Sequence, residues 1–184
     1  MDDLHLLERI RAGDSDAFDA MFRANYAGLV GTAERLLGRR DVAEEIVQDV
    51  MLELWRRRET LAVDESLRGY LFRATRNRAL NHLRHGAIEK RAEPEIAASR
   101  VESGSGAHAA LVEEEIEVAV RRAMADLPDR CREVFELSRV NGLRYAEIAT
   151  TLGISVKTVE AQMGKALRIL RERLAQWLPD SRSP

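Results

Sequence analysis

Apolar residues recur every three or four positions along most of this chain, and that spacing restricts its fold more than any other feature. One such pattern runs from Asp14 or Asp16, either of which can cap a helix, to Gly38. A second helix is expected from Asp41, with Glu44 in a capping-box-like position, and a third from Ser66. Pro (4) and Gly (11) are scarce in these stretches, so the sequence predicts an all-α protein.

The helical pattern stops after Gly86 and resumes near His108. The intervening "EPEIAASRVESGSGAHAA" contains Pro, Gly, Ser and Glu and has no sustained apolar period, which is typical of a linker. We therefore expect two small helical domains, at residues 1–86 and 109–178, joined by a flexible linker at 87–108. A short tail, 179–184, follows the second domain. Limited proteolysis is expected to cut first in the linker.

Several protein classes are disfavoured. No apolar run is long enough to span a bilayer, and the acidic start lacks the apolar core of a signal peptide, so a cytoplasmic protein without membrane insertion is expected. The single cysteine, Cys131, has no partner for an internal disulfide and is expected to be buried. His82 and His85 stand one helical turn apart without a third ligand, so no metal site is predicted. No cofactor and no catalytic residue are predicted either.

The distribution of charge is more informative than the net charge of −2. Residues 68–91 contain seven Lys or Arg and one acid, and residues 139–173 contain seven Lys or Arg and three acids. An acidic stretch, 92–120, separates them. Two basic stretches on helical units favour a polyanion as partner, although a basic face is often only solvated.

The C-terminal segment "YAEIATTLGISVKTVEAQMGKALRIL" predicts a helix–turn–helix. Gly153 permits a left-handed turn, Ile154 fills the angle between two helices and Ser155 caps the second. Ala149 and Val159 stand at the spacing that such a motif requires of its packing residues. The second helix would be packed on one side and free on the other, as a DNA-reading helix is.

These residues support a resemblance. The C-terminal segment resembles the promoter-binding C-terminal domain of bacterial sigma factors, and "DAFDAMFRANYAGLVGTAERLLGRRDVAEEIVQDVMLELWRRRETL" with "SLRGYLFRATRNRALNHLRH" resembles their domain for core polymerase and the minus-ten element. Two such domains with a short linker are similar to the extracytoplasmic-function group of the sigma-70 family. The resemblance implies core RNA polymerase and promoter DNA as partners, an anti-sigma factor as a further partner, and no catalysis by the chain itself.

The resemblance also implies roles for residues of the first domain. The polymerase-binding set lies on the second helix: Glu45, Gln48, Asp49 and Leu52. The minus-ten set lies on the third helix: Arg68, Tyr70, Phe72, Arg73, Arg76, Asn77, Arg78, Asn81 and Arg84. Arginines can hold strand phosphates, and the two aromatic rings can stack on unpaired bases, although Tyr70 is expected to be core. The loop 61–65 corresponds to one that accepts a flipped base in this family.

In the second domain, the resemblance implies a recognition helix that reads the minus-thirty-five element with one set of residues: Ser155, Lys157, Thr158, Glu160, Ala161, Gln162, Lys165 and Arg168. Glu160 stands where basic or small polar residues are usual in this family. A carboxylate there is either stabilised by the positive end of the helix dipole or accepts a hydrogen bond from a cytosine amino group. Thr158 and Lys165 are expected to contact phosphates.

Two alternatives remain open from the sequence. A LuxR-like transcriptional regulator has a similar recognition helix, but it usually carries a receiver or ligand-binding domain, and the first 86 residues show no alternation of strands and helices. A helical enzyme or scaffold with locally basic faces is the other. Binding to core RNA polymerase separates the sigma-factor interpretation from both.

Overall fold

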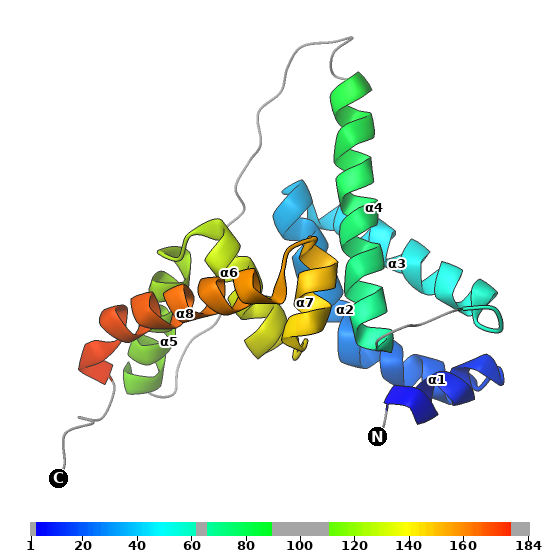
Figure 1. Cartoon of the computed structure of the whole chain (residues 1–184), viewed down its shortest axis with the longest axis horizontal. Coiled ribbons are helices and arrows are strands. Elements are labelled where there is room, and N and C mark those ends of the chain that lie inside the picture. Colours follow the sequence, from blue (N-terminus) through cyan, green and yellow to red (C-terminus); the bar gives the residue numbers. More distant parts are fainter. Residues whose placement is uncertain (1–2, 62–65, 90–110, 178–184) are drawn as a thin grey trace. The chain divides into compact units, whose positions relative to one another are not determined.

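A computed structural model describes residues 3–61, 66–89 and 111–177, and all regular structure within them is helical (Figure 1). The all-α class expected from the periodicity is thus confirmed. The polypeptide divides into two compact units. The first contains α1 to α4, and the second contains α5, α6, η1, α8, η2 and most of α7.

The N-terminal unit consists of α1 (Asp3–Arg11), α2 (Ser15–Leu37), α3 (Arg40–Arg57) and α4 (Leu67–Glu89). Of the two candidate caps, Asp14 is the one that caps α2, because it accepts hydrogen bonds from the backbone of residues 16 and 17. Gly38, near the expected end, terminates the helix with a φ of 69°. Ser66 caps α4, because its hydroxyl accepts a 3.0 Å hydrogen bond from the backbone N–H of Gly69.

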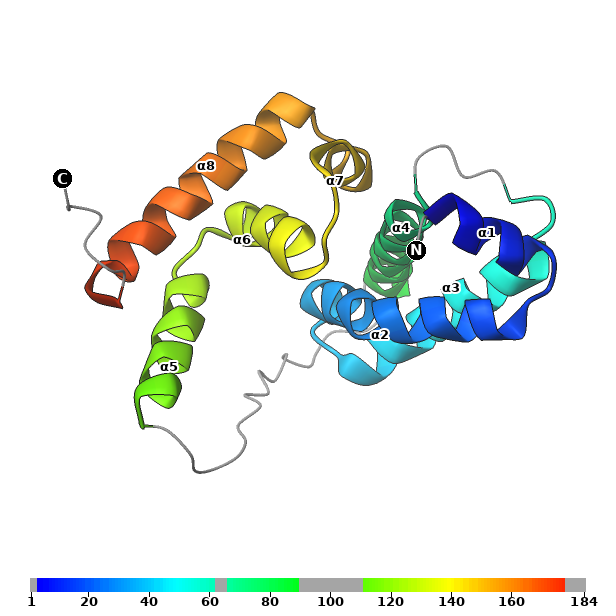
Figure 2. The ribbon, with the colours of Figure 1, turned by 90° about the horizontal axis from the view of Figure 1, so that it is seen from below.

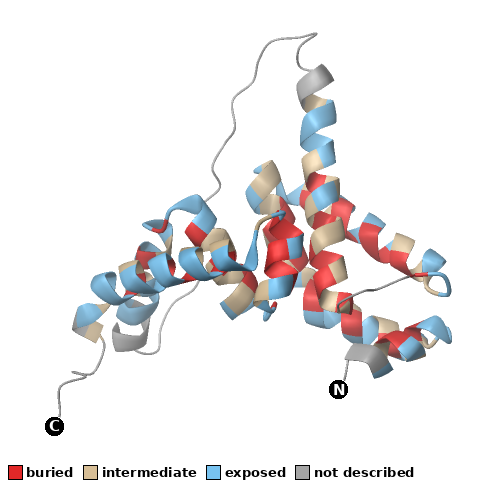
Figure 3. Cartoon of the chain, viewed as in Figure 1, coloured by how far each residue is buried: buried red, intermediate tan, exposed pale blue. Residues whose placement is uncertain are grey.

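The core of this unit lies where α2 packs against α3 and α4, with α1 packed on α2 (Figure 2). Its largest fully buried side chains include Met21 and Leu29 of α2, Leu54 of α3, and Leu71 and Phe72 of α4. Residues 81–85, near the end of α4, are all exposed, so this end of the helix extends beyond the core (Figure 3). A long exposed helical segment of this kind leaves room for a macromolecular partner.

The C-terminal unit consists of α5 (Leu111–Ala125), α6 (Asp129–Phe135), the π-helical turn η1 (Glu136–Val140), α7 (Tyr145–Leu152), α8 (Val156–Arg173) and η2 (Ala175–Trp177). One core cluster joins Ala123, Leu127 and Cys131 to Ala166 and Leu170 of α8. Cys131 is fully buried, as expected from its lack of a partner.

The helix–turn–helix is formed by α7 and α8, which meet at a sharp turn (Figure 2). Gly153 has a φ of 66°, and the Ser155 hydroxyl accepts a 3.0 Å hydrogen bond from the backbone N–H of Thr158, so both predictions are confirmed. The buried carboxylate of Glu147 closes the other end of α7 by accepting a 2.6 Å hydrogen bond from the backbone N–H of Arg144.

The structure differs from the sequence-based interpretation in one additional helix and at two helix ends. Helix α1 was not expected, although Leu7 and Ile10 are buried. Helix α3 begins at Arg40 and its N-cap is Arg39, so Asp41 lies in the first turn, where it pairs with Arg39, and is not the cap. Helix α4 continues to Glu89, three residues past the expected boundary.

The remaining predicted boundaries fall largely outside the described residues. Of the expected linker, residues 90–108 are not described, and neither is the tail, 179–184. Among the described helices, none has both the length and the apolarity needed to cross a membrane.

Candidate polymerase and nucleic-acid interfaces

The four residues expected to bind polymerase are all exposed and lie on one side of α3. Gln48, Asp49 and Leu52 stand three, four and seven residues after Glu45, which brings all four onto one face of a helix. Leu52 leaves 45% of its surface exposed, although it is a large aliphatic residue. The opposite side of α3, with Ile46, Val47, Val50 and Leu54, is buried against the core.

An apolar groove, which no sequence pattern indicates, adjoins this face. It has a volume of about 390 Å³ and is lined by Phe18 and Phe22 of α2 and by Met51, Leu52 and Trp55 of α3, with Ser15 and Gln48. The Phe18 and Trp55 rings lie 5.0 Å apart, centroid to centroid, which fixes one wall. The groove gives the acidic face of α3 an apolar neighbour, a combination that suits a helix bearing both basic and aliphatic side chains.

On α4, one set of the expected minus-ten residues points away from the core. Tyr70, Arg73, Asn77, Asn81 and Arg84 recur at intervals of three and four residues and are half-exposed or exposed. Arg84 donates a 3.2 Å hydrogen bond to the side-chain oxygen of Asn81, so these two form one polar surface near the helix end. This outward stripe presents basic and hydrogen-bonding side chains to solvent.

The exposure of the two aromatic residues of α4 is the reverse of what the sequence suggested. Phe72, expected to stack on a base, is only 1% exposed and belongs to the core. Tyr70, expected to be core, is half-exposed. Phe72 shares its face of α4 with the buried Thr75 and Ala79, at the spacing of three and four residues that defines the packed side. In this structure Phe72 is therefore not available for stacking.

Two of the expected DNA-binding arginines are engaged by neighbouring helices or partly covered. Arg68 Nε donates a 3.1 Å hydrogen bond to the side-chain oxygen of Asn25 on α2. Asn25 is itself buried and donates a 2.8 Å hydrogen bond to the carbonyl of Met21. Arg76 is half-buried. Some arginines of α4 thus point outward, whereas others, such as Arg68, also form contacts with a neighbouring helix.

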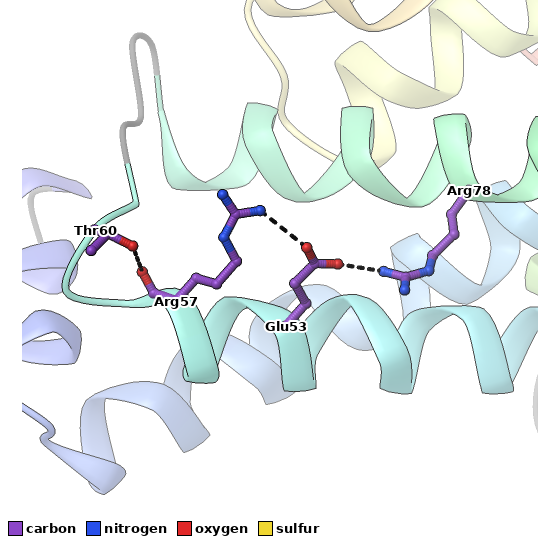
Figure 4. A network of polar contacts seen from close by, with 4 residues as sticks. All are labelled: Glu53, Arg57, Thr60 and Arg78. Atoms are coloured by element: carbon purple, nitrogen blue, oxygen red, sulfur yellow. Dashed lines mark hydrogen bonds and ion pairs between the residues drawn. The ribbon is translucent and has the colours of Figure 1, made fainter.

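Arg78 belongs to a charged network with α3 (Figure 4). Its Nη1 donates a 2.8 Å hydrogen bond to Oε2 of Glu53, and Arg57 Nη1 donates a 3.2 Å hydrogen bond to the other carboxylate oxygen. Asp49 lies farther away, with 3.9 Å between its carboxylate and Arg78 Nε. The hydrogen bond from Arg78, followed by that from Arg57, lowers the pKa of Glu53 below its ordinary value.

The loop before α4 is described only at its ends. Leu61 is buried, and its carbonyl accepts a 2.7 Å hydrogen bond from Arg11 Nη2 of α1. Ser66, at the other end, caps α4. Residues 62–65, which include most of the segment expected to accept a flipped base, lie outside the described residues.

The outward face of α8 carries most of the expected recognition residues. Lys157, Glu160, Ala161, Lys165 and Arg168 are exposed, as is Gly164. Val159, Met163, Ala166 and Leu170 are buried on the opposite side. The Ser155 and Thr158 hydroxyls lie 2.8 Å apart and bond each other at the start of the helix. One face of α8 therefore packs and the other is open, as the sequence predicted.

Gln162 differs from the rest of the recognition set. It is half-buried, and its side-chain oxygen accepts a 3.0 Å hydrogen bond from the thiol of Cys131 on α6. The position of Gln162, three residues after Val159 and four before Ala166, does indicate partial burial, because both of these residues lie on the packed side. Gln162 thus has a structural contact that ties α8 to α6.

Within the described part of the chain, no three His, Cys, Asp or Glu residues gather in a way that would hold a metal ion. His82 and His85 are both exposed on α4. The described surfaces are therefore characterised by charge, exposed hydrogen-bonding groups and an apolar groove.

Comparison with known families matches both units. Residues 21–87 match the model of Sigma-70 region 2, and residues 117–170 match the model of Sigma-70 region 4. The first match spans nearly all of α2 to α4, and the second spans most of α5 together with α6 to α8. Each helical unit thus has its own counterpart in one protein family.

Two curated relatives cover almost the whole chain. The chain is 30% identical to the ECF RNA polymerase sigma factor SigK of Mycobacterium ulcerans, over 94% of this chain and 94% of that protein. It is 26% identical to the RNA polymerase sigma-H factor of Pseudomonas aeruginosa, over 97% of each.

Two solved structures share the fold. CnrH, solved with the cytosolic domain of CnrY, has a TM-score of 0.58 and 22% identity, covering 95% of this chain and 97% of that one. The sigma factor RpoE, solved with the anti-sigma factor NepR from Bartonella quintana, has a TM-score of 0.62 and 21% identity, covering 86% of this chain and 96% of that one.

Proposed function

Because the chain belongs to the extracytoplasmic-function (ECF) sigma factors of the sigma-70 family, we propose that three of its helices divide the work of promoter recognition. As a sigma factor it joins core RNA polymerase and directs it to promoters. In our proposal α3 docks on the polymerase, α4 holds the minus-ten strand and α8 reads the minus-thirty-five element. The LuxR-like alternative leaves the region 2 match of residues 21–87 without explanation.

The observation that carries this proposal is the pair of outward polar faces on α4 and α8. Each helix packs one side into its own core and leaves the other side exposed with an excess of basic residues. Phosphate contacts from such faces fix register on nucleic acid without choosing sequence. Base choice then rests on the few non-basic side chains between them.

On α4, the strand-binding set is narrower than the sequence suggested. Arg73 and Arg84 contact phosphates, Asn77 and Asn81 supply hydrogen bonds to bases or sugars, and Tyr70 is the stacking residue in place of Phe72. A half-exposed Tyr at the start of an outward stripe suits a single strand, since one stacked base contributes roughly 1–3 kcal/mol. Phe72 instead supports the helix from beneath.

On α8, Glu160 reads a cytosine of the minus-thirty-five element. It is exposed between Lys157 and Lys165 on the open face, so flanking lysines can hold the backbone while the carboxylate accepts a hydrogen bond from the N4 amino group. Ala161 contacts a thymine methyl group. Gly164 leaves space for the DNA backbone, because the point that a Cβ would occupy there has no heavy atom within 4 Å apart from its chain neighbours and the backbone of its own helix.

On α3, the acidic face and Leu52 form the polymerase contact. An exposed leucine beside an apolar groove provides the anchor, and Glu45 and Asp49 select a basic partner surface. The same surface also suits an inhibitor that competes with polymerase, and we include an anti-sigma factor among the partners. The chain contributes recognition and no catalytic group, and it acts in the cytoplasm, where the polymerase is.

A pull-down with immobilised bacterial core RNA polymerase tests the α3 assignment. The chain should be retained, and Leu52→Asp should lose retention because it places a charge at the apolar anchor. Ile116→Asp is a matched control, since Ile116 is 39% exposed and lies on α5 of the other unit. Failure of the unaltered chain to be retained would refute the polymerase contact, and equal losses in both variants would refute the assignment to α3.

A further inference from the structure

The Glu53–Arg78 ion pair links the helix proposed to bind polymerase with the helix proposed to bind the minus-ten strand (Figure 4). Glu53 projects from α3 and Arg78 from α4, and their closest atoms are 2.8 Å apart. Each side chain is 41% exposed, so the pair lies at the surface of the unit and not in its core. A negatively charged ligand can therefore reach Arg78.

Arg78 occupies the flank of the outward stripe of α4. It follows the exposed Asn77 directly, and its neighbour on the other side, Ala79, is fully buried. A guanidinium in this position can turn toward α3, where it now meets Glu53, or toward a strand lying along the stripe. A phosphate and the Glu53 carboxylate are both anionic oxygen acceptors for a guanidinium, so they compete for Arg78.

From this geometry we infer that Glu53 is a positioning residue that competes with the nucleic-acid backbone for Arg78 and thereby lowers the affinity of the free protein for a single strand. The inference rests on the proposed role of α4. A strand that uses Arg78 must displace Glu53, which then keeps its second partner, Arg57, at 3.2 Å. Glu53 is therefore not left without a cation when Arg78 leaves.

The size of the effect follows from the exposure of the pair. An exposed ion pair of this kind shifts an equilibrium by about 1.5- to 5-fold. Glu53→Gln removes the competing charge, so the affinity for a single strand should rise by about that factor. One more phosphate contact should also steepen the dependence of log affinity on log salt concentration by about 0.7 for a single strand.

Chain variants that differ in one charge provide the test. The full-length chain is titrated against a fluorescein-labelled oligothymidine by fluorescence anisotropy at several salt concentrations. Glu44→Gln is the matched control: Glu44 also lies on α3 and pairs with Arg40 at 3.0 Å, and its side chain is 36% exposed. It changes the net charge equally without contacting Arg78. Glu53→Asp keeps the charge and should stay close to the unaltered chain.

We expect Glu53→Gln to bind more tightly with a steeper salt dependence, and Glu44→Gln to change little. In the Arg78→Ala background, Glu53→Gln should have no further effect, because the group that it releases is gone. An equal gain in Glu44→Gln, a gain that survives Arg78→Ala, or no gain in Glu53→Gln would overturn the inference. Absence of oligothymidine binding by the unaltered chain would instead refute the proposed role of α4, so the two proposals fail separately.

Discussion

Replacing Glu160 separates base reading from helix stabilisation more sharply than any other single change on α8. Glu160 is the fifth residue of the helix, which begins at Val156, and it is exposed. The helix dipole acts mainly within the first turn, so at this position a carboxylate contributes at most a few tenths of a kcal/mol. Base readout by a side chain is worth roughly 1–3 kcal/mol at one base pair.

These magnitudes predict a large change in specificity with a small change in stability. Glu160→Ala should relax the preference at one minus-thirty-five position by about 5- to 150-fold, the factor that corresponds to roughly 1–3 kcal/mol. Its melting temperature should remain near that of the unaltered chain. Glu160→Gln should shift the preferred base from cytosine toward adenine, because an amide can both donate to and accept from adenine.

The assay is selection of promoters with a randomised minus-thirty-five element. Core polymerase with each variant is bound to the library, and the retained DNA is sequenced. The melting temperature of each variant, measured by thermal unfolding, reports the contribution of Glu160 to stability. An unchanged preference at every position in both variants would refute base reading by Glu160 and leave only the dipole effect.

Four further predictions concern the core, the cap, the backbone contacts and acid stability. Phe72→Ala should lower the free energy of unfolding of the N-terminal unit by about 3–5 kcal/mol in a urea titration, because Phe72 is buried, whereas Tyr70→Ala should cost less. Ser155→Ala should lower the stability of the C-terminal unit by about 1 kcal/mol in the same assay, since it removes the hydrogen bond to the Thr158 backbone. Lys165→Ala should weaken binding to all promoters alike and flatten the slope of log affinity against log salt by about one, measured by filter binding. The lowered pKa of Glu53 means that its contribution to stability is present above its ordinary pKa and is lost as pH falls through the lowered value, so Glu53→Gln should flatten the acid limb of stability against pH.

Features encoded in a few adjacent residues were predictable from the sequence. The cap at Ser155 and the left-handed turn at Gly153 depend on local backbone geometry, and both were predicted correctly. Asp14, one of two candidate caps, is the cap of α2, and this helix ends at Gly38, close to the expected position. The start of α3 was predicted incorrectly because Arg39, directly before the helix, pairs with Asp41 and the cap position falls on Arg39 itself. A competition between ion pairing and helix capping at one side chain can be resolved only from the side-chain geometry.

Features that depend on packing between helices were harder to predict. The spacing of Phe72, Thr75 and Ala79 did contain the signal for burial of Phe72, but the resemblance to aromatic positions of the family outweighed it. The Glu53–Arg78 pair joins residues 25 positions apart, and no local pattern indicates it. The groove beside Leu52 requires both α2 and α3, so it appears only when the helices are packed.

Transcription in vitro tests the central claim most directly. Core RNA polymerase is supplied with the purified chain and with genomic DNA fragments from its own source, and transcript starts are mapped by sequencing. The account predicts a small set of new start sites that depend on the chain and share upstream minus-ten and minus-thirty-five elements. Start sites identical to those of core polymerase alone, on every fragment, would contradict it.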